Sequence, residues 1–285
     1  MTYRELLNSA TKILCDAGIS DASSDAWILF SERCGLSRSE YFMHAEDEIT
    51  NEELINKLFD DVRKRADGCP VQYITGKQNF CGLDFFVSPD TLIPRFDTEV
   101  LTEIVLKEAK NKTVLDMCTG TGCILISLCA LSESVTGVGS DISEGAAELA
   151  KKNAEYNGVA DKTHFFAGDL FNALTGTKYE SYEFDIIVSN PPYIKDEDIK
   201  KLDVSVKNYE PIAALSGHSD GLWFYKKITE EAGKHLKQNG LLAYETGYDE
   251  GKDVSEIMKR YGYTNIRIFK DYAGLDRVVT GRKGN

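Results

Sequence analysis

One short run of residues carries the clearest chemical signal in this sequence. Residues 189–193 read Ser-Asn-Pro-Pro-Tyr and follow directly after residues 184–188, an apolar stretch typical of a buried strand. Two adjacent prolines neither continue a sheet nor open an ordinary helix, so the backbone must stop there and hold a fixed shape. That shape carries a side-chain amide at Asn190 and an aromatic ring at Tyr193. Such a corner is suited to gripping a flat NH2 group.

The chemistry that this corner suits is transfer to a weakly nucleophilic nitrogen. The nitrogen of an amide or aromatic amine attacks slowly because its lone pair is delocalised. The side-chain carbonyl of Asn190 and the backbone carbonyl of Pro191, whose direction Pro192 helps to fix, would accept both N–H bonds and favour a tetrahedral nitrogen. A wrong substrate would leave these acceptors unpaired. Tyr193 would lay its ring against the substrate or a positive charge. A merely rigid loop with an Asx turn is the structural alternative.

A glycine turn upstream points to a nucleoside ligand. Gly120 and Gly122 follow a strand-like stretch, and a tight glycine turn lets a ligand approach the backbone closely. The turn lacks the third glycine of a dinucleotide fingerprint and the Lys-Ser/Thr of a phosphate-binding loop. Asp141 ends the next expected strand, where a carboxylate accepts hydrogen bonds from both ribose hydroxyls. The expected ligand is a ribonucleoside without a pyrophosphate, and S-adenosylmethionine fits.

Two more acidic residues are candidates for the same site. Asp169 ends the third expected strand and could accept the adenine amino group, with Leu170 packed against the base. An aspartate that caps the next helical turn is the competing interpretation of Asp169. Asp116 could touch the glycine turn or the ammonium group of the methionine part, directly or through water.

The elements that must position these residues change along the chain. Residues 1–75 show mainly helical spacing, although 71–76 is rich in strand-forming residues. Residues 76–98 predict a β-hairpin linker. Residues 99–285 alternate strand and helix, which predicts a mostly parallel, doubly wound α/β sheet. The last two strands are too close for a helical crossover, so they should pair antiparallel. Together with the nucleoside site, this predicts a Rossmann-like class I methyltransferase sheet with a small all-helical N-terminal domain.

Composition narrows the class of protein. The 285 residues carry 33 Lys+Arg and 46 Asp+Glu, a net charge of −13 that disfavours non-specific nucleic-acid binding and serves solubility or a basic partner. There is neither a long apolar run for a membrane span nor a signal peptide at the start. The 7 cysteines form no Cys-x-x-Cys pair, and the 4 histidines show no ligand spacing with them. We therefore expect a cytoplasmic protein with reduced thiols and no metal site.

Several ordered runs resemble the PrmC/HemK family, the release factor glutamine methyltransferases. The resemblance covers nearly all of residues 70–285 and, more weakly, the helical start. The Asn-Pro-Pro-Tyr run alone is shared with other amino-group methyltransferases, so the ordered set of runs carries the specificity. The matching runs lie at residues 70–76, 92–95, 114–116, 118–123, 141–143, 187–194, 210–211, 220–222 and 271–277.

The resemblance implies an activity and a set of roles. The family methylates, with S-adenosylmethionine, the side-chain amide nitrogen (N5) of the glutamine in the Gly-Gly-Gln motif of peptide chain release factors. Asn190 would bridge donor and substrate, while residues 190–193 grip the glutamine and the domain at 1–75 helps dock the release factor. The implied donor contacts are Cys118, Thr119, Gly120, Thr121, Gly122, Asp141 and Leu170.

Some positions depart from the family pattern, and two other activities stay open. Phe96 follows Arg95 where the family has proline, His218 replaces a second glycine, and Thr246 stands where isoleucine is usual. These departures leave loop details around the substrate mouth open. A DNA adenine methyltransferase would use the same corner on a flipped base, but it needs basic grooves and a target-recognition region. A non-catalytic scaffold would have lost Asn190, Asp141 or a turn glycine.

Overall fold

The computed structural model describes residues 1–284, and the chain forms two compact units. One unit comprises Met1–Lys77 together with Asp203–Tyr209. The other comprises Gln78–Leu202 together with the chain from Glu210 onward. The segment at 203–209 therefore belongs to the helical unit, although both of its flanks belong to the unit that contains the large sheet.

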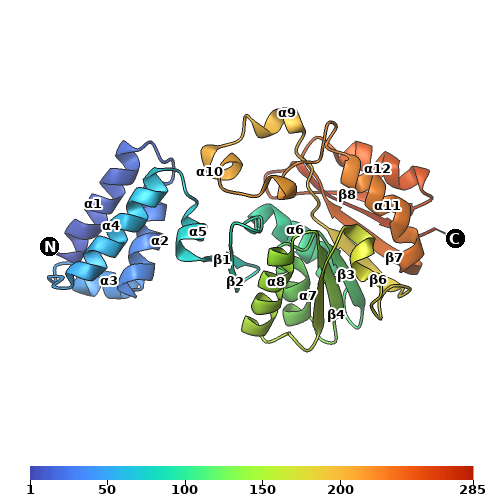
Figure 1. The fold of residues 1–285 in the computed structure, drawn as a ribbon, viewed down its shortest axis with the longest axis horizontal. Coiled ribbons are helices and arrows are strands. Elements are labelled where there is room, and N and C mark those ends of the chain that lie inside the picture. The colour runs from blue at the N-terminus through green and yellow to red at the C-terminus, as the bar shows by residue number, and fades with distance from the viewer. Residues whose placement is uncertain (285) are drawn as a thin grey trace. The chain divides into compact units, whose positions relative to one another are not determined.

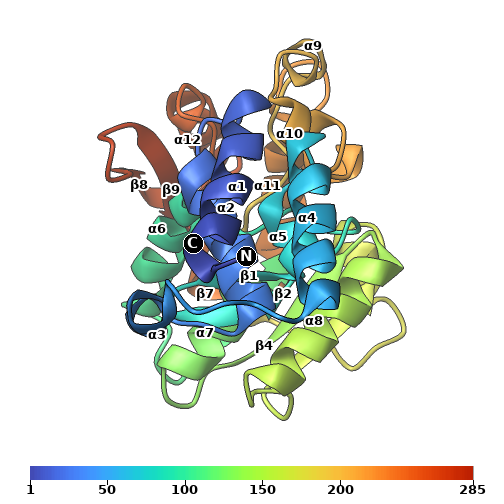
Figure 2. The same cartoon turned by 90° about the vertical axis from the view of Figure 1, so that its left-hand side faces the viewer.

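Capping and apolar spacing explain the helical unit. Its helices are α1 (Tyr3–Asp16), α2 (Ala22–Cys34), α3 (Arg38–His44), α4 (Glu52–Ala66), α5 (Val71–Thr75) and α10 (Val204–Lys207). The side chains of Thr2, Ser37 and Asn51 accept backbone N–H bonds at the starts of α1, α3 and α4, which satisfies donors that a helix end leaves free. Figures 1 and 2 show α1, α2 and α4 packed lengthwise, and they bury one apolar cluster that includes Leu14 and Phe30.

The strand expected at residues 71–76 is wrong, because the structure has α5 there. This helix begins after Pro70 and ends at Gly76, whose φ of 77° is left-handed. Val71 packs into the apolar cluster of the helical unit. That tertiary contact outweighs the strand preference of its β-branched side chain.

A two-stranded hairpin follows α5. Its strands are β1 (Lys77–Phe80) and β2 (Leu83–Phe86). Cys81 and Gly82 join them, and both have positive φ, as a two-residue hairpin turn requires. The first strand thus begins just after the stretch in which the sequence predicted it.

A seven-stranded sheet forms the centre of the larger unit. Its strands are β3 (Thr113–Met117), β4 (Thr136–Asp141), β5 (Thr163–Ala167), β6 (Phe184–Ser189), β7 (Leu236–Glu245), β8 (Thr264–Lys270) and β9 (Asp276–Arg282). Their spatial order is β5-β4-β3-β6-β7-β9-β8, and β9 runs antiparallel to both neighbours while the other pairs are parallel. The expected mostly parallel sheet with an antiparallel last strand is confirmed. Chain order runs outward from β3 through β4 to β5 and, in the other direction, from β6 to β7, so the carboxyl ends of β3 and β6 mark a switch point where open α/β sheets bind ligands.

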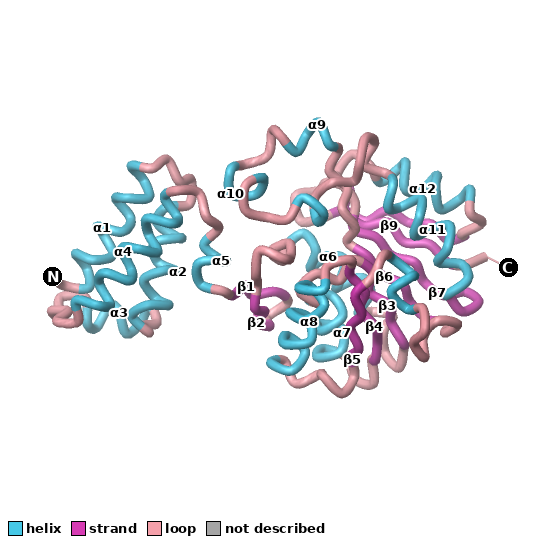
Figure 3. The backbone as a smooth tube through the Cα atoms, in the orientation of Figure 1, coloured by secondary structure: helices cyan, strands magenta, loops and turns pink. Residues whose placement is uncertain are grey.

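Helices cover both faces of this sheet, as Figures 1 and 3 show. The helices α6 (Phe96–Leu106), α7 (Cys123–Leu131) and α8 (Glu144–Tyr156) cover one face, and α11 (Trp223–His235) and α12 (Gly251–Arg260) cover the other. Residues 123–129 of α7 are all buried. Each buried Leu or Ile side chain stabilises the fold by about 1.5–3 kcal/mol. The two layers therefore hold the strand ends firmly in place.

Three short helical segments complete the larger unit. They are η1 (Leu170–Leu174), which follows β5, and α9 (Asp196–Ile199) and η2 (Ile212–Ala214), which lie in the long connection after β6. Among residues 1–284, none of the helices has both the length and the apolar character that crossing a membrane requires.

Candidate active site

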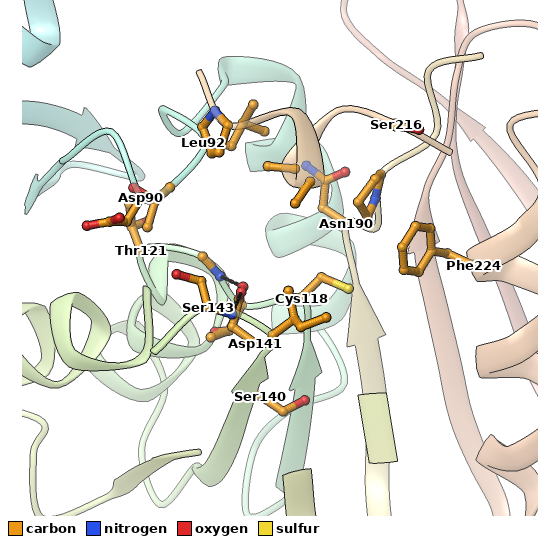
Figure 4. A pocket seen from close by; sticks show the side chains of 18 of the residues that line it. Asp90, Leu92, Cys118, Thr121, Ser140, Asp141, Ser143, Asn190, Ser216 and Phe224 are labelled. Carbon is orange, nitrogen blue, oxygen red and sulfur yellow. Dashed lines mark hydrogen bonds between the residues drawn. The ribbon is translucent and has the colours of Figure 1, made fainter. Parts of the chain in front are cut away.

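A cavity of about 630 Å³ opens at the carboxyl ends of β3, β4 and β6. That volume is typical of a pocket for one small molecule. Figure 4 shows Cys118 and Asp141 at the strand ends and Asn190 across the cavity from them. The predicted site residues that line the cavity are Cys118, Thr119, Gly120, Thr121, Asp141, Asp169, Leu170, Asn190 and Pro192.

The glycine turn after β3 is tied to the end of β4 by Asp141. The backbone N–H of Gly120 donates to Oδ2 of Asp141 at 2.9 Å, and the N–H of Ser143 donates to Oδ1 at 3.0 Å. Burial raises the pKa of Asp141, and these backbone hydrogen bonds oppose that shift. A carboxylate has about four lone-pair sites, so at least one stays unused beside the backbone N–H groups of Gly120, Ser143 and Ile142. Asp141 can therefore hold the turn and accept hydrogen bonds from a ligand at the same time.

Asp116 supports the same turn from beneath. It is fully buried, and its Oδ2 accepts a hydrogen bond of 2.7 Å from the hydroxyl of Thr119. Burial raises its pKa to about 7, and the bonds from Thr119 and from the backbone of Leu125 oppose that rise. Asp116 therefore touches the glycine turn directly, which was one of the two contacts considered for it.

Asp169 and Leu170 line the cavity beyond the end of β5. Asp169 precedes η1, yet its side chain makes no capping hydrogen bond there. Asp169 thus occupies the N-cap position that the alternative expected, but not through its side chain, and its contact with the adenine stays a prediction. Leu170 has a left-handed φ of 47°, which is unusual for a residue other than glycine. Strained backbone of this kind is concentrated at ligand sites.

The corner after β6 is fixed at both of its ends. The hydroxyl of Ser189 donates to the carbonyl of Met117 at 2.7 Å, which ties the start of the corner to β3. The N–H of Ile194 donates to the carbonyl of Leu215 at 3.0 Å, which ties down its end. Between them, Nδ2 of Asn190 donates to Oγ1 of Thr98 at 3.2 Å. The proline-stiffened corner thus holds a half-buried amide at the cavity wall.

Tyr193 does not line the cavity, and its hydroxyl contacts a carboxyl group behind the corner. That hydroxyl donates to Oε1 of Glu245 at 3.4 Å. Burial raises the pKa of Tyr193, and the nearby charge of Glu245 adds to this. Its expected contact with the substrate stays a prediction, while its observed contact is with a buried carboxyl group.

The remaining wall of the cavity is apolar and aromatic. The imidazole of His218 stacks on Phe224 with ring centroids 5.8 Å apart, and Trp223 lies beside them.

Arg95 forms an ion pair with the buried carboxylate of Glu210, which ties the start of α6 to the segment before η2. Burial raises the pKa of Glu210, and the charge of Arg95 opposes that rise. The sequence marked these stretches but assigned no role to their side chains.

Two sequence families match the chain, the PrmC N-terminal domain at residues 5–76 and the Methyltransferase small domain at residues 95–208. A release factor glutamine methyltransferase from Agrobacterium fabrum is 39% identical over 284 residues, which cover 97% of this chain and 96% of that protein. One from Clostridium acetobutylicum is 40% identical over 287 residues, covering 100% of this chain and 99% of that protein. A methyltransferase structure from Pyrococcus furiosus shares the fold, with a TM-score of 0.53 at 21% identity over 72% of this chain and 91% of that one.

The chain belongs to the release factor glutamine methyltransferase family. Membership confirms the expected family and the expected class of enzyme, a methyltransferase that depends on S-adenosylmethionine. The match at residues 5–76 places the family's N-terminal domain on the helices α1 to α5.

Besides Tyr193, two of the predicted site residues, Gly122 and Pro191, lie outside the cavity lining. Gly122 precedes α7 with a φ of 79°, and a Cβ there would lie 2.8 Å from Cδ1 of Ile126 and 3.1 Å from Cβ of Ala150. Its smallness serves the packing of helices against the sheet. Pro191 is buried beside Asn190, and the predicted contribution of its carbonyl stays a prediction.

Three residues that reach the corner were missed as site residues. Thr98 and Glu245 contact Asn190 and Tyr193, and Arg277 lies among the charged groups around Glu245. The sequence signal for Glu245 was its place at the end of an expected strand, whereas the pairing of its neighbour Tyr244 with Ser189 of β6 comes only from the structure. Among residues 1–284, there is no group of three or more His, Cys, Asp or Glu side chains that could hold a metal ion.

Proposed function

We propose that this chain transfers the methyl group of S-adenosylmethionine to the side-chain amide nitrogen (N5) of the glutamine in the Gly-Gly-Gln motif of peptide chain release factors, and so modulates translation termination. The observation that carries the proposal is one cavity in which the Asn190 corner lies opposite the turn at Gly120 and the carboxylate of Asp141. The relatives named release factor glutamine methyltransferase support the choice of acceptor. They favour it over the DNA adenine methyltransferase and scaffold alternatives.

The cavity residues fit S-adenosylmethionine. Gly120 has a φ of 54° and open space where a Cβ would stand, so a ligand can approach its backbone. Asp141 binds the ribose hydroxyls with its remaining lone-pair capacity, while Asp169 accepts the adenine amino group and Leu170 packs against the base. Cys118, Thr119 and Thr121 complete the donor side, as the list of lining residues allows. When bound, the donor supplies a methyl group activated by a positively charged sulfur.

The chain's own residues deal with the weak nucleophile. The oxygen of Asn190 and the carbonyl of Pro191 accept the two N–H bonds of the glutamine amide and draw its nitrogen toward a tetrahedral shape. Pro192 and Tyr193 complete the grip on the side chain. A nitrogen–carbon bond forms as a carbon–sulfur bond breaks, and the surplus proton on nitrogen then passes to water. A strong general base is unnecessary because the methyl group is already activated.

The same proposal assigns the parts of the chain and its partners. Residues 1–75 help dock the release factor, residues 76–98 form the hairpin linker, and residues 99–285 carry catalysis. Release factors are the protein partner in the cytoplasm, and neither nucleic acid nor a membrane is a partner. The net charge of −13 supports the absence of nucleic-acid binding, since phosphate affinity depends on cationic surfaces.

The test is a methyl-transfer assay on a purified release factor. The factor is incubated with this chain and S-adenosylmethionine labelled in the methyl group, and its peptides are then mapped by mass spectrometry. Label on the glutamine of the Gly-Gly-Gln peptide is the expected result. A folded enzyme that leaves this peptide unlabelled would overturn the proposed function, and label on DNA adenine in a parallel arm would replace it.

Asn190→Ala separates catalysis from donor binding. The variant loses one of two acceptors for the substrate amide, so most turnover should disappear. Affinity for S-adenosylhomocysteine should stay within roughly tenfold, about 1.4 kcal/mol. Titration calorimetry beside the methyl-transfer assay measures both. A much larger loss of nucleoside affinity would mean that Asn190 serves mainly the donor.

A further inference from the structure

The Asn190 amide helps an NH2 substrate in only one of its two orientations. Its oxygen must face the cavity, because its own NH2 end would meet the substrate donor to donor. The two orientations differ by a half-turn, and the hydrogen-bonding neighbours decide between them. Nδ2 of Asn190 donates to Oγ1 of Thr98, which turns the amide oxygen the other way. Thr98 lies in the first turn of α6, is buried, and also reaches the cavity wall.

A second contact sets the direction of this hydrogen bond. The hydroxyl of Thr98 lies close to the carboxyl group of Glu245, the last residue of β7, and lowers the pKa of that carboxyl group. A hydroxyl has one hydrogen, and an ionised carboxylate can only accept. A hydroxyl beside a carboxylate points its hydrogen toward that carboxylate, so the oxygen of Thr98 is left to accept from Asn190. Glu245 does not line the cavity, so it acts on the site through Thr98 and through the hydroxyl of Tyr193, which donates to its Oε1 at 3.4 Å.

The surroundings of Glu245 hold it in place and tune its charge. It is 1% exposed, and its Oε2 has no hydrogen-bond partner among residues 1–284. Burial raises its pKa to about 7, while the hydroxyl of Thr98 and the charge of Arg277 oppose that rise. Arg277 itself is held at 3.1 Å by Asp271. The titratable and charged groups that face Glu245 from α6, α7, the corner, α11 and β9 are Asp97, Cys123, Tyr193, Tyr225 and Arg277.

We propose that Thr98 and Glu245 are positioning residues that hold the Asn190 amide with its oxygen toward the NH2 group of the acceptor. The inference rests on the proposed function, because only an NH2 acceptor needs this orientation. Three residues from three different elements, α6, the corner and β7, thus act together, because Asn190 donates to Thr98 and the hydroxyl of Thr98 lies beside the carboxyl group of Glu245. Their effect is on turnover rather than on donor binding, since the nucleoside contacts lie at the ends of β3, β4 and β5.

Thr98→Val tests the first link, because valine keeps the shape of threonine and removes the hydroxyl. We expect kcat to fall about 10- to 100-fold, as for other supporting groups behind a catalytic side chain. The KM for S-adenosylmethionine should stay within about threefold, since ground-state donor binding is untouched. Thr98→Ser keeps a hydroxyl and should restore most of kcat. Thr102→Val is the matched control, because Thr102 is equally buried one turn later on α6 and its hydroxyl contacts the carbonyl of Thr98 and the thiol of Cys81 rather than Asn190.

The outcomes distinguish the two hypotheses. Wild-type enzyme that fails to label the release factor contradicts the proposed function and not this inference. Active wild-type enzyme with Thr98→Val as active as Thr102→Val overturns the role of Thr98. A serine variant as slow as the valine variant overturns it as well, because the hydroxyl would then not be the group that matters. Circular dichroism checks that each variant is folded. If Thr98→Val is not folded, the Glu245→Gln variant decides.

Glu245→Gln tests the second link through pH. Protonated Glu245 can donate a hydrogen to the oxygen of Thr98 and turn the hydroxyl hydrogen of Thr98 toward Asn190. The ionised carboxylate cannot donate and so cannot do this. Wild-type kcat should therefore fall as pH falls through about 7, the pKa of Glu245. Glutamine has no proton to gain in this range, so the variant should lose this acidic limb. Burial also raises the pKa values of Asp116 and Glu250 to about 7, and a limb that persists in the variant would belong to one of them and overturn the role of Glu245.

Discussion

At the scale of single residues, the site depends on carboxyl groups that the fold has removed from water. Burial raises the pKa values of Asp116 and Glu245 to about 7. Both stand in strands next to the switch point, one in β3 and one at the end of β7. Each directs a threonine hydroxyl, Thr119 in the glycine turn and Thr98 beside the corner. Buried acids of this kind fix hydrogen-bond direction at the expense of stability near neutral pH.

Asp116→Asn should show how much stability the buried acid costs the protein near neutral pH. The pKa of Asp116 rises from 3.8 to about 7 on folding, so the folded state favours the neutral acid. Its contribution to stability is fully present below pH 3.8 and is lost as pH rises through about 7. Asparagine stays neutral and can still accept from Thr119. Relative to wild type, the variant should therefore gain stability between pH 5 and pH 8, measured as the difference in urea midpoint at each pH. A difference that does not change with pH would contradict the raised pKa.

The residues that the sequence predicts are those whose signal is local. Gly120, Asp141 and Asn190 each follow an apolar strand directly, so strand ends alone bring them together. Thr98 lies 92 residues from Asn190 along the chain, and its hydroxyl gains a role only through packing of α6 against the sheet. The contact of Tyr193 was equally hard to predict, because its partner Glu245 lies on another strand, and residue spacing alone does not align that strand with Tyr193.

At the scale of elements, the two turn glycines serve different purposes and should respond differently to alanine. Gly122→Ala places a Cβ 2.8 Å from Ile126 in α7 and 3.1 Å from Ala150 in α8, at a left-handed φ. We expect a loss of about 2–4 kcal/mol of unfolding free energy from backbone strain and overpacking together. Gly120→Ala meets open space and should lose only about 1–2 kcal/mol for its left-handed φ. Its larger effect should be weaker S-adenosylhomocysteine binding, because the new methyl group stands where the ligand approaches.

Urea denaturation and calorimetric titration of the two variants give the comparison. If Gly122→Ala retained wild-type stability, the packing of α7 and α8 around this turn would be wrong. If Gly120→Ala bound the nucleoside normally, the turn would not contact the ligand closely.

The sheet was more predictable than the elements before it. Apolar runs such as residues 184–188 are long enough, and regular enough in their alternation with helices, to give the parallel order and the antiparallel end. Residues 71–76 carry the same strand-forming types, yet α5 forms because Val71 packs into the helical cluster and Gly76 ends the helix. Short segments follow their tertiary contacts, and these are invisible in local composition.

At the scale of the whole molecule, the chain's two units do not divide at a single point. Residues 203–209 join the helical unit, where Tyr209 donates from its hydroxyl to the carbonyl of Asp67 at 3.2 Å. A Cβ on Gly68 would lie 3.1 Å from Cγ1 of Val204, so a residue without a side chain suits that close packing. This arrangement was not predictable from residue patterns, because α10 spans only four residues and shows no periodicity.

Arg65→Ala should show which parts of the chain unfold together. Nε of Arg65 donates to Oδ2 of Asp25 at 2.6 Å, and the two side chains are only 14% and 10% exposed. Removing the arginine leaves a largely buried carboxylate unpaired, which should destabilise the helical unit by about 3–5 kcal/mol. Hydrogen exchange should then accelerate in α2, α4 and residues 203–209, which share that unit. Strands β3 and β6 belong to the other unit and should keep their protection.

Arg63→Ala is the matched control for this prediction, since Arg63 lies on the same helix and pairs with Asp60 at the exposed surface. An exposed pair contributes about 0.2–1 kcal/mol, so exchange should change little in either unit. Equal acceleration in β3, β6 and the helices after Arg65→Ala would mean that the chain unfolds as one body. If exchange accelerated in α2 and α4 but not in residues 203–209, this segment would belong to the larger unit. The division of the chain into units would then be wrong at that point.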